Sequence, residues 1–247
     1  MWRPAPLRDE WLPRSATPAP ARPEPQPHLR VRVSRTVDGH ALLAATWGTL
    51  AFRKDIRADG SFHALMEQGS DRLALCGSRL GLHLTYGTRS LTISPADECI
   101  AARRRARELL LATPVAQIFR RLGGDLEEAG ALHPEACSVR VTAALLAEID
   151  GDESAVRRLG RAVMAHERAL TGARLGPGGE AGAVRTFAER VVRASVDLEQ
   201  RVMRSSTWST ARAAAALDWA LQVESATFEL AVLAPSAHET PRTWRNP

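Results

Sequence analysis

Four arginines stand close together in the stretch "ECIAARRRARELLL", where their side chains could bind phosphates or carboxylates. They are Arg103, Arg104, Arg105 and Arg107. On a helix, Arg103 and Arg107 would share one face, while Arg104 and Arg105 would point around the cylinder. A guanidinium group is planar, stays charged and suits bidentate contacts with phosphate oxygens. The stretch therefore predicts a basic collar for a polyanion, although a solvated helix face is the simpler alternative.

A second group of arginines lies in "VTAALLAEIDGDESAVRRLGRAV", within residues 141–169. The apolar spacing, with a short Asp150-Gly151 turn between two helical stretches, resembles in part that of a helix-turn-helix unit. The second helix would then present Arg157, Arg158 and Arg161 to phosphates or guanine edges.

This resemblance is incomplete. Leu146 stands where the first helix of such a unit usually has alanine, and the turn glycine falls one place late. Asp150, Asp152 and Glu153 would also repel phosphates. Two antiparallel bundle helices joined by a capped turn are the alternative.

Signals of catalysis or metal binding are weak. The segment "GPGGEAG" lacks the lysine and hydroxyl of a phosphate-binding loop, and a calcium loop starting at Asp150 would need glycine where Ala155 stands. His133 and Cys137 have no second ligand pair near them in the sequence, and no nucleophile motif is present. We therefore expect no catalytic residue, no metal and no cofactor, while an enzymatic activity without a recognisable motif stays open.

The arginines need elements to position them, and the first such elements are strands. Residues 29–94 alternate apolar and polar side chains, with Asp38-Gly39 and Asp59-Gly60 as turn signals. About six short antiparallel strands are expected there, forming a small barrel or sandwich. Nine basic and five acidic residues fall in this range, among them Arg30 and Arg32, so it is the basic part of the chain.

Helices are expected after residue 94, because "SPADE" at 94–98 offers an N-cap, a proline at the first helical position and early acids. The expected ranges are 95–112, 114–122, 134–149, 153–171, about 181–204 and about 208–233. The last range has little polar surface and contains Trp219. It is either the central helix of the bundle or a subunit interface, where Trp219 would dock on a partner.

Both ends of the chain are rich in proline and arginine, and they contain Trp2, Trp11 and Trp244. Such compositions favour extended backbone and cannot build a core. Because tryptophan is enriched where proteins anchor on partners, we interpret both ends as tethers. A tether could dock on a neighbouring copy, on a larger assembly or on the protein's own groove.

These observations predict an α+β protein with four parts. An N-terminal tail (1–28) precedes an antiparallel β domain (29–94), a helical bundle domain (95–234) and a C-terminal tail (235–247). Three scattered cysteines suit a reducing compartment, and no apolar run long enough for a membrane span or signal peptide is present, so a cytoplasmic protein without membrane contact is expected.

Two functions follow as hypotheses. In the first, the protein binds nucleic acid without catalysis, through the helical arginines together with Arg30 and Arg32, which would converge on one positive surface. It would work as a dimer joined by its last helix. In the second, it is a structural or adaptor subunit of a larger assembly, docked through its tryptophan-containing tails and its last helix.

Overall fold

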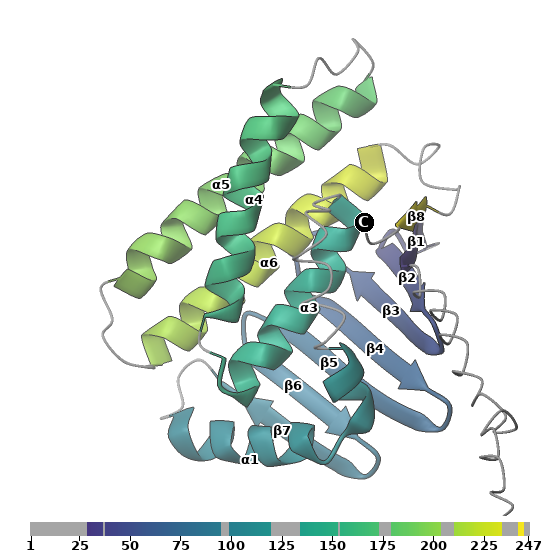
Figure 1. The fold of residues 1–247 in the computed structure, drawn as a ribbon, viewed down its shortest axis with the longest axis vertical. Helices are drawn as coiled ribbons and strands as arrows, with labels where there is room; N and C mark the ends of the chain where they lie inside the picture. Colours follow the sequence, from purple (N-terminus) through teal and green to yellow (C-terminus); the bar gives the residue numbers. More distant parts are fainter. Residues whose placement is uncertain are drawn as a thin grey trace, which may run out of the picture.

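The structure is a computed structural model of the 247-residue chain. It describes residues 29–36, 38–94, 99–119, 134–152, 154–172, 179–203, 210–233 and 242–244. Within these ranges the chain is a single antiparallel sheet with helices over one of its faces (Figure 1). The α+β class expected from the sequence is confirmed.

The sheet is an open meander, with strand order β7-β6-β5-β4-β3-β2-β1-β8. Its strands are β1 (Leu29–Arg35), β2 (Ala41–Trp47), β3 (Leu50–Ile56), β4 (Phe62–Gln68), β5 (Asp71–Ser78), β6 (Gly81–Tyr86), β7 (Arg89–Ile93) and β8 (Arg242–Trp244). Gly39 and Gly60 have φ values of 79° and 80°, as expected for the two Asp-Gly turns. Antiparallel strands were correctly predicted for this part of the chain. The expected closure into a barrel or sandwich is absent from the described sheet.

One face of the sheet is buried because its strands alternate apolar and polar residues. In β2, Ala41, Leu43 and Ala45 are buried, whereas Leu42 and Ala44 between them are only partly covered. The other strands repeat this period of two. Among the described residues, the sheet therefore has one face covered by helices and one open face, and the open face carries the alternate residues.

The helices lie close to the ranges expected from the sequence. They are α1 (Cys99–Leu111), α3 (Pro134–Asp150), α4 (Ala155–Gly172), α5 (Gly179–Met203) and α6 (Thr210–Leu233), with a further helical segment over residues 114–119. Helix α6 contacts β1, β2, β3, β5 and β6, while α5 packs on α6 and α4 packs on both α5 and α3. Helix α1 contacts β7 and α3. Figure 1 shows α6 running over the sheet and α4 with α5 farther from it.

The largely apolar character of α6 is explained by this central position. Neighbours surround it on several sides, so the alternative of a central helix holds within this chain. Buried apolar residues of the sheet and the helices form one continuous cluster, from Val31 and Leu43 to Leu145 and Val223. The boundary expected at residues 94 and 95 separates strands from helices along the sequence, and the two parts share one core.

The C-terminal segment joins the sheet of its own chain. Strand β8 pairs antiparallel with the start of β1, placing Trp244 opposite Leu29 and Thr243 opposite Arg30. Residues 242–244 therefore dock on their own chain, at the edge of the sheet and not in a groove. None of the described helices is both long and apolar enough to cross a membrane.

Candidate nucleic-acid interface

Most of the predicted helical arginines are engaged with acidic or carbonyl groups of the same chain. Arg158 Nη2 lies 2.6 Å from Asp152 Oδ2, and Arg161 Nε lies 2.6 Å from Glu199 Oε1. The hydrogen bond from Arg158 is the main reason that the pKa of Asp152 falls to about 2. These two guanidinium groups are therefore already neutralised by neighbouring carboxylates.

Two of the four arginines of the basic collar on α1 are also engaged within the chain. Arg107 Nε lies 3.6 Å from Asp150 Oδ1, and Arg103 donates from Nη2 to the backbone oxygen of Glu148 at 3.3 Å. Both contacts tie α1 to the end of α3. Arg104 and Arg105 are exposed, and Arg157 on α4 is partly buried.

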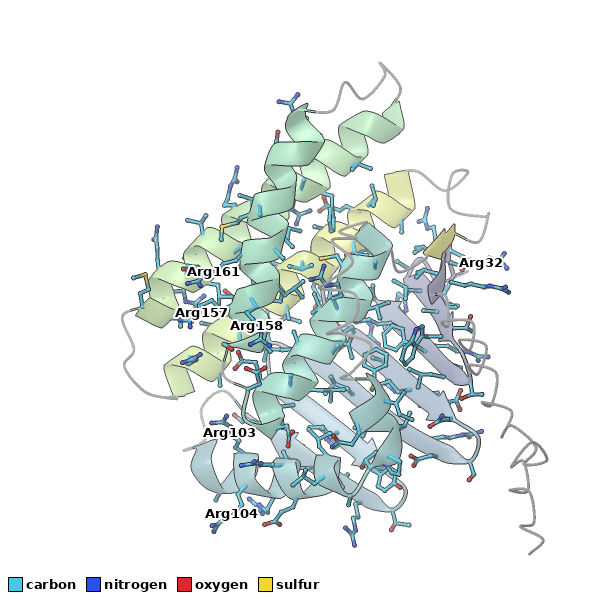
Figure 2. All side chains as sticks on the ribbon, viewed as in Figure 1. Arg32, Arg103, Arg104, Arg157, Arg158 and Arg161 are labelled. Carbon is cyan, nitrogen blue, oxygen red and sulfur yellow. The ribbon has the colours of Figure 1, made fainter. Side chains whose placement is uncertain are left out.

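The nine arginines predicted from the sequence do not meet on one surface. Helix α1 packs beside β7, whereas Arg30 and Arg32 belong to β1. Six strand spacings separate β7 from β1, or about 29 Å. Figure 2 shows Arg103 and Arg104 at one end of the molecule and Arg32 at the other. In addition, Arg30 and Arg32 alternate with Val31 and are on the open face, opposite the helices.

Strands β1 and β3 form a basic group on that open face. Arg32 is in cross-strand register with Ala44, and Ala44 is in register with Arg53, so these three residues make one row across β1, β2 and β3. Arg30 begins the neighbouring row and is in register with Thr46. The β2 residues between the arginines, Ala44 and Thr46, have small side chains, so they do not shield the guanidinium groups from solvent. We call Arg30, Arg32 and Arg53 the open-face arginine patch.

The patch differs from Arg103, Arg107, Arg158 and Arg161 in having side chains that are not engaged with other groups of the chain. All three of its side chains are exposed, and none makes an ion pair or side-chain hydrogen bond with any described residue. Of the acids on this face, Glu67 pairs with Arg72 at 2.9 Å, whereas Asp55 Oδ1 lies 3.0 Å from His40 Nδ1, a contact that is an ion pair only when the imidazole is protonated. Among the described residues, the open face therefore presents an excess of positive charge on its β1–β3 side, where three exposed arginines face one carboxylate, that of Asp55.

A cavity of about 230 Å³ lies farther along the same face, over the ends of β3, β4 and β5. Side chains of the open face line it: Asp55, Arg57, Ser61, His63, Cys76 and Ser78. His63 is in register with Asp55 on one side and with Cys76 on the other. Burial raises the pKa of the Cys76 thiol, so this thiol is protonated at neutral pH.

The predicted docking tryptophans fall in different places. Trp219 is only 1% exposed and donates from Nε1 to Ser195 Oγ at 3.0 Å, so it is part of the core instead of an outer surface. A helix surrounded by α3, α5 and the sheet leaves this side chain no route to a partner. Trp244 belongs to β8, and Trp2 and Trp11 lie outside the described residues.

The chain's one lysine is enclosed between the layers. Lys54 Nζ donates to Glu224 Oε1 at 2.5 Å, to Thr142 Oγ1 at 2.8 Å and to the backbone oxygen of Ser138 at 3.2 Å. Lys54 and Glu224 are both fully buried. Burial lowers the pKa of Lys54 and raises that of Glu224, and their mutual attraction opposes both changes. All three ammonium donors are used, so this cluster joins β3 to α3 and α6 and is not open to a ligand.

Arg53, Arg57 and Lys54 are not among the site residues predicted from the sequence. A signal was present, because "FRKDIR" alternates Phe52 and Ile56 with Arg53, Asp55 and Arg57 in a strand pattern. That alternation places Lys54 on the apolar side, where a charged residue is unexpected. It also places Arg53 on the same side as the polar residues of β1.

The described residues include no group of three His, Cys, Asp or Glu side chains arranged to hold a metal ion. Comparisons with models of protein families, with curated proteins and with solved structures found no match.

Proposed function

We propose that this protein binds nucleic acid without catalysis, and that the open-face arginine patch makes the main phosphate contacts. The observation that carries the proposal is the cluster of three exposed arginines on β1 and β3, on either side of β2, with no acidic partner among the described residues. Guanidinium groups of this kind can contact successive phosphates, and each contact releases counterions that were bound to the nucleic acid. The proposal keeps the function expected from the sequence and moves its centre from the helices to the sheet.

The spacing of the patch suits a chain of phosphates. Arg30 and Arg32 are two residues apart on one strand, or about 7 Å, and Arg32 and Arg53 are two strands apart, or about 10 Å. Ala44 and Thr46 between them do not obstruct a backbone lying across the strands. By contrast, a ligand of Arg158 or Arg161 would have to displace Asp152 or Glu199 first.

The test is a salt titration of binding with charge-reversed variants. We expect Arg30→Glu/Arg32→Glu/Arg53→Glu to abolish binding of a labelled oligonucleotide at moderate salt. Replacing the three residues by glutamine should lower the slope of log affinity against log salt by about 2, because each lost contact with a single strand removes about 0.7. Fluorescence anisotropy between low and moderate salt gives both quantities.

A matched control uses three arginines that are exposed and unpaired elsewhere among the described residues. Arg104→Glu/Arg105→Glu/Arg193→Glu makes the same change in net charge on α1 and α5. Affinity should fall only slightly, through the general field of the protein. If this control loses binding as fully as the patch variant, the site is not on the sheet, and if the wild-type protein binds no nucleic acid at low salt, the proposed function is wrong.

The adaptor hypothesis gains less support from the same features. Trp219 is used inside the core, and the strand that contains Trp244 pairs with β1 of its own chain. Two of the four residues assigned to partner docking therefore belong to elements that complete this fold.

A further inference from the structure

The cavity beside the open-face arginine patch extends the same surface and suggests what part of a nucleic acid this protein contacts. Strand β3 connects the two features, because Arg53, Asp55 and Arg57 follow one another on the open face at every second position. From Arg53 to Arg57 the strand advances about 14 Å. A nucleic-acid strand whose phosphates lie on the patch therefore reaches Arg57 within a few nucleotides.

The lining of the cavity has the groups that recognise a heterocyclic base. Ser78 supplies a hydroxyl, His63 an imidazole and Cys76 a neutral thiol, and Arg57 stands at the margin with no ion pair among the described residues. Asp55 is an acceptor held in place by His40. A volume of about 230 Å³ is sufficient for one heterocyclic ring system. A bare phosphate is a poorer occupant, because the Asp55 carboxylate lines the site.

The shape of the surface separates single strands from duplexes. The major groove of a duplex admits a helix or a two-stranded ribbon, whereas this face is the middle of an eight-stranded sheet. Helices that could enter a groove lie over the opposite face (Figure 1). A single strand can lie across an open sheet and turn an unpaired base toward it, as sheet-based RNA-binding and single-strand-binding modules do.

We infer that the open face binds single-stranded nucleic acid, with phosphates on the arginine patch and one unstacked base in the cavity lined by His63, Cys76 and Ser78. This inference rests on the proposed function and adds the ligand class and the base subsite. The base contributes affinity that a duplex, whose bases are stacked and paired, cannot supply.

The first experiment uses the wild-type protein and needs no variant. Three labelled probes of equal length are compared by anisotropy: a mixed-sequence single strand, the corresponding duplex and an abasic sugar–phosphate strand. We expect the single strand to bind about tenfold more tightly than the abasic strand and the duplex, which is the effect of one accommodated base. The salt slopes of the single strand and the abasic strand should agree, since both present the same phosphates.

A cavity-filling variant provides the second measurement. Ser78→Trp places a large side chain in the cavity, and Ser90→Trp places the same side chain at an exposed site of the open face on β7, outside the cavity and the patch. Ser78→Trp should lower single-strand affinity about tenfold and leave abasic-strand affinity unchanged. Ser90→Trp should change neither value. Circular dichroism shows that each variant is folded before it is compared.

Three outcomes would overturn the inference while leaving the proposed function in place. They are equal binding of single strand and duplex, equal binding of the single strand and the abasic strand, and loss of affinity in Ser90→Trp as large as in Ser78→Trp. In each case, binding that is still lost when Arg30, Arg32 and Arg53 are replaced would support the phosphate site of the proposed function. Absence of binding to all three probes removes both proposals.

Discussion

Glu148 is a carboxyl group kept inside the protein next to the turn between α3 and α4. It is only 4% exposed, and its Oε1 accepts a hydrogen bond from the backbone nitrogen of Val156 at 3.4 Å. Its Oε2 is buried without a hydrogen-bond partner among the described residues. Burial raises the pKa of Glu148 to about 7, although Arg212 and Arg103 lie near enough to oppose the rise.

This raised pKa predicts a loss of stability with rising pH. The folded state holds the proton of Glu148 more tightly than the unfolded chain, whose pKa is about 4.5. The stabilising contribution is therefore complete below about pH 4.5 and is lost as the pH rises through about 7. The difference between the two pKa values corresponds to about 3 kcal/mol. Urea unfolding at pH 5 and pH 8 measures it.

Glu148→Gln is the matched variant, because it keeps the size of the side chain and removes the titration. The difference in unfolding free energy between pH 5 and pH 8 should be smaller in this variant than in the wild-type protein by most of that amount. All other ionisable groups are the same in both proteins, so their contribution cancels in the comparison. An unchanged pH dependence in Glu148→Gln would show that Glu148 is ionised in the folded protein at pH 5.

The positive charge of each arginine could be predicted from the sequence. Whether that arginine is already paired with an acidic residue of the same chain could not. Arg158 and Asp152 are six residues apart, and a local pairing could have been considered. Arg161 pairs with Glu199, which is 38 residues away on another helix, so only the packing of α4 on α5 reveals it. The cavity similarly requires the register of three strands, because Asp55, His63 and Cys76 are distant in sequence.

At the scale of elements, the turn between β3 and β4 shows how the sheet is fixed to its central helix. Gly60 has a φ of +80°, and a Cβ on this residue would lie 1.8 Å from the backbone oxygen of Leu221 on α6. Ser225 also donates from Oγ to the backbone oxygen of Ala58 at 2.9 Å. The absence of a side chain at position 60 therefore lets the hairpin approach α6 closely.

Gly60→Ala should consequently destabilise the protein more than an alanine placed in a similar but open turn. Gly69 has a φ of +59° and no atom within 4 Å of its ideal Cβ, so Gly69→Ala bears only the conformational cost of about 1–2 kcal/mol. Gly60→Ala adds the displacement of the hairpin from α6, which is about 1–3 kcal/mol more. Chemical denaturation of both variants measures the difference. Equal costs would mean that the hairpin does not pack against α6 in solution.

The elements themselves followed from local signals, whereas their arrangement did not. Asp-Gly turns and alternation indicated the strands, and caps and apolar periodicity indicated helices at 134–149 and about 208–233, close to α3 and α6. An amphipathic strand pattern is the same in a barrel, a sandwich and an open sheet covered by helices. Which of these forms depends on α6 lying against the sheet, and a helix that is apolar on all sides does not specify its neighbours.

At the scale of the whole molecule, the buried cluster around Lys54 joins the sheet to two of the helices that share its core, α3 and α6. Lys54 comes from β3, Glu224 from α6, and Ser138 and Thr142 from α3. Ser138 Oγ also donates to Glu224 Oε2 at 2.7 Å. Separating the sheet from the helices would expose this ion pair and the continuous apolar cluster together. We therefore expect the strands and helices to unfold as one cooperative unit.

Lys54→Met tests this expectation, because it leaves Glu224 buried without a counter-charge. The variant should lose about 3–5 kcal/mol of unfolding free energy, and Lys54→Met/Glu224→Leu should recover most of the loss. In native-state hydrogen exchange, amides of β3 and of α6 should share one opening free energy in the wild-type protein and fall together in Lys54→Met. Two separate opening free energies, with only one reduced by the substitution, would instead favour residues 29–94 and 95–234 as independently folding domains.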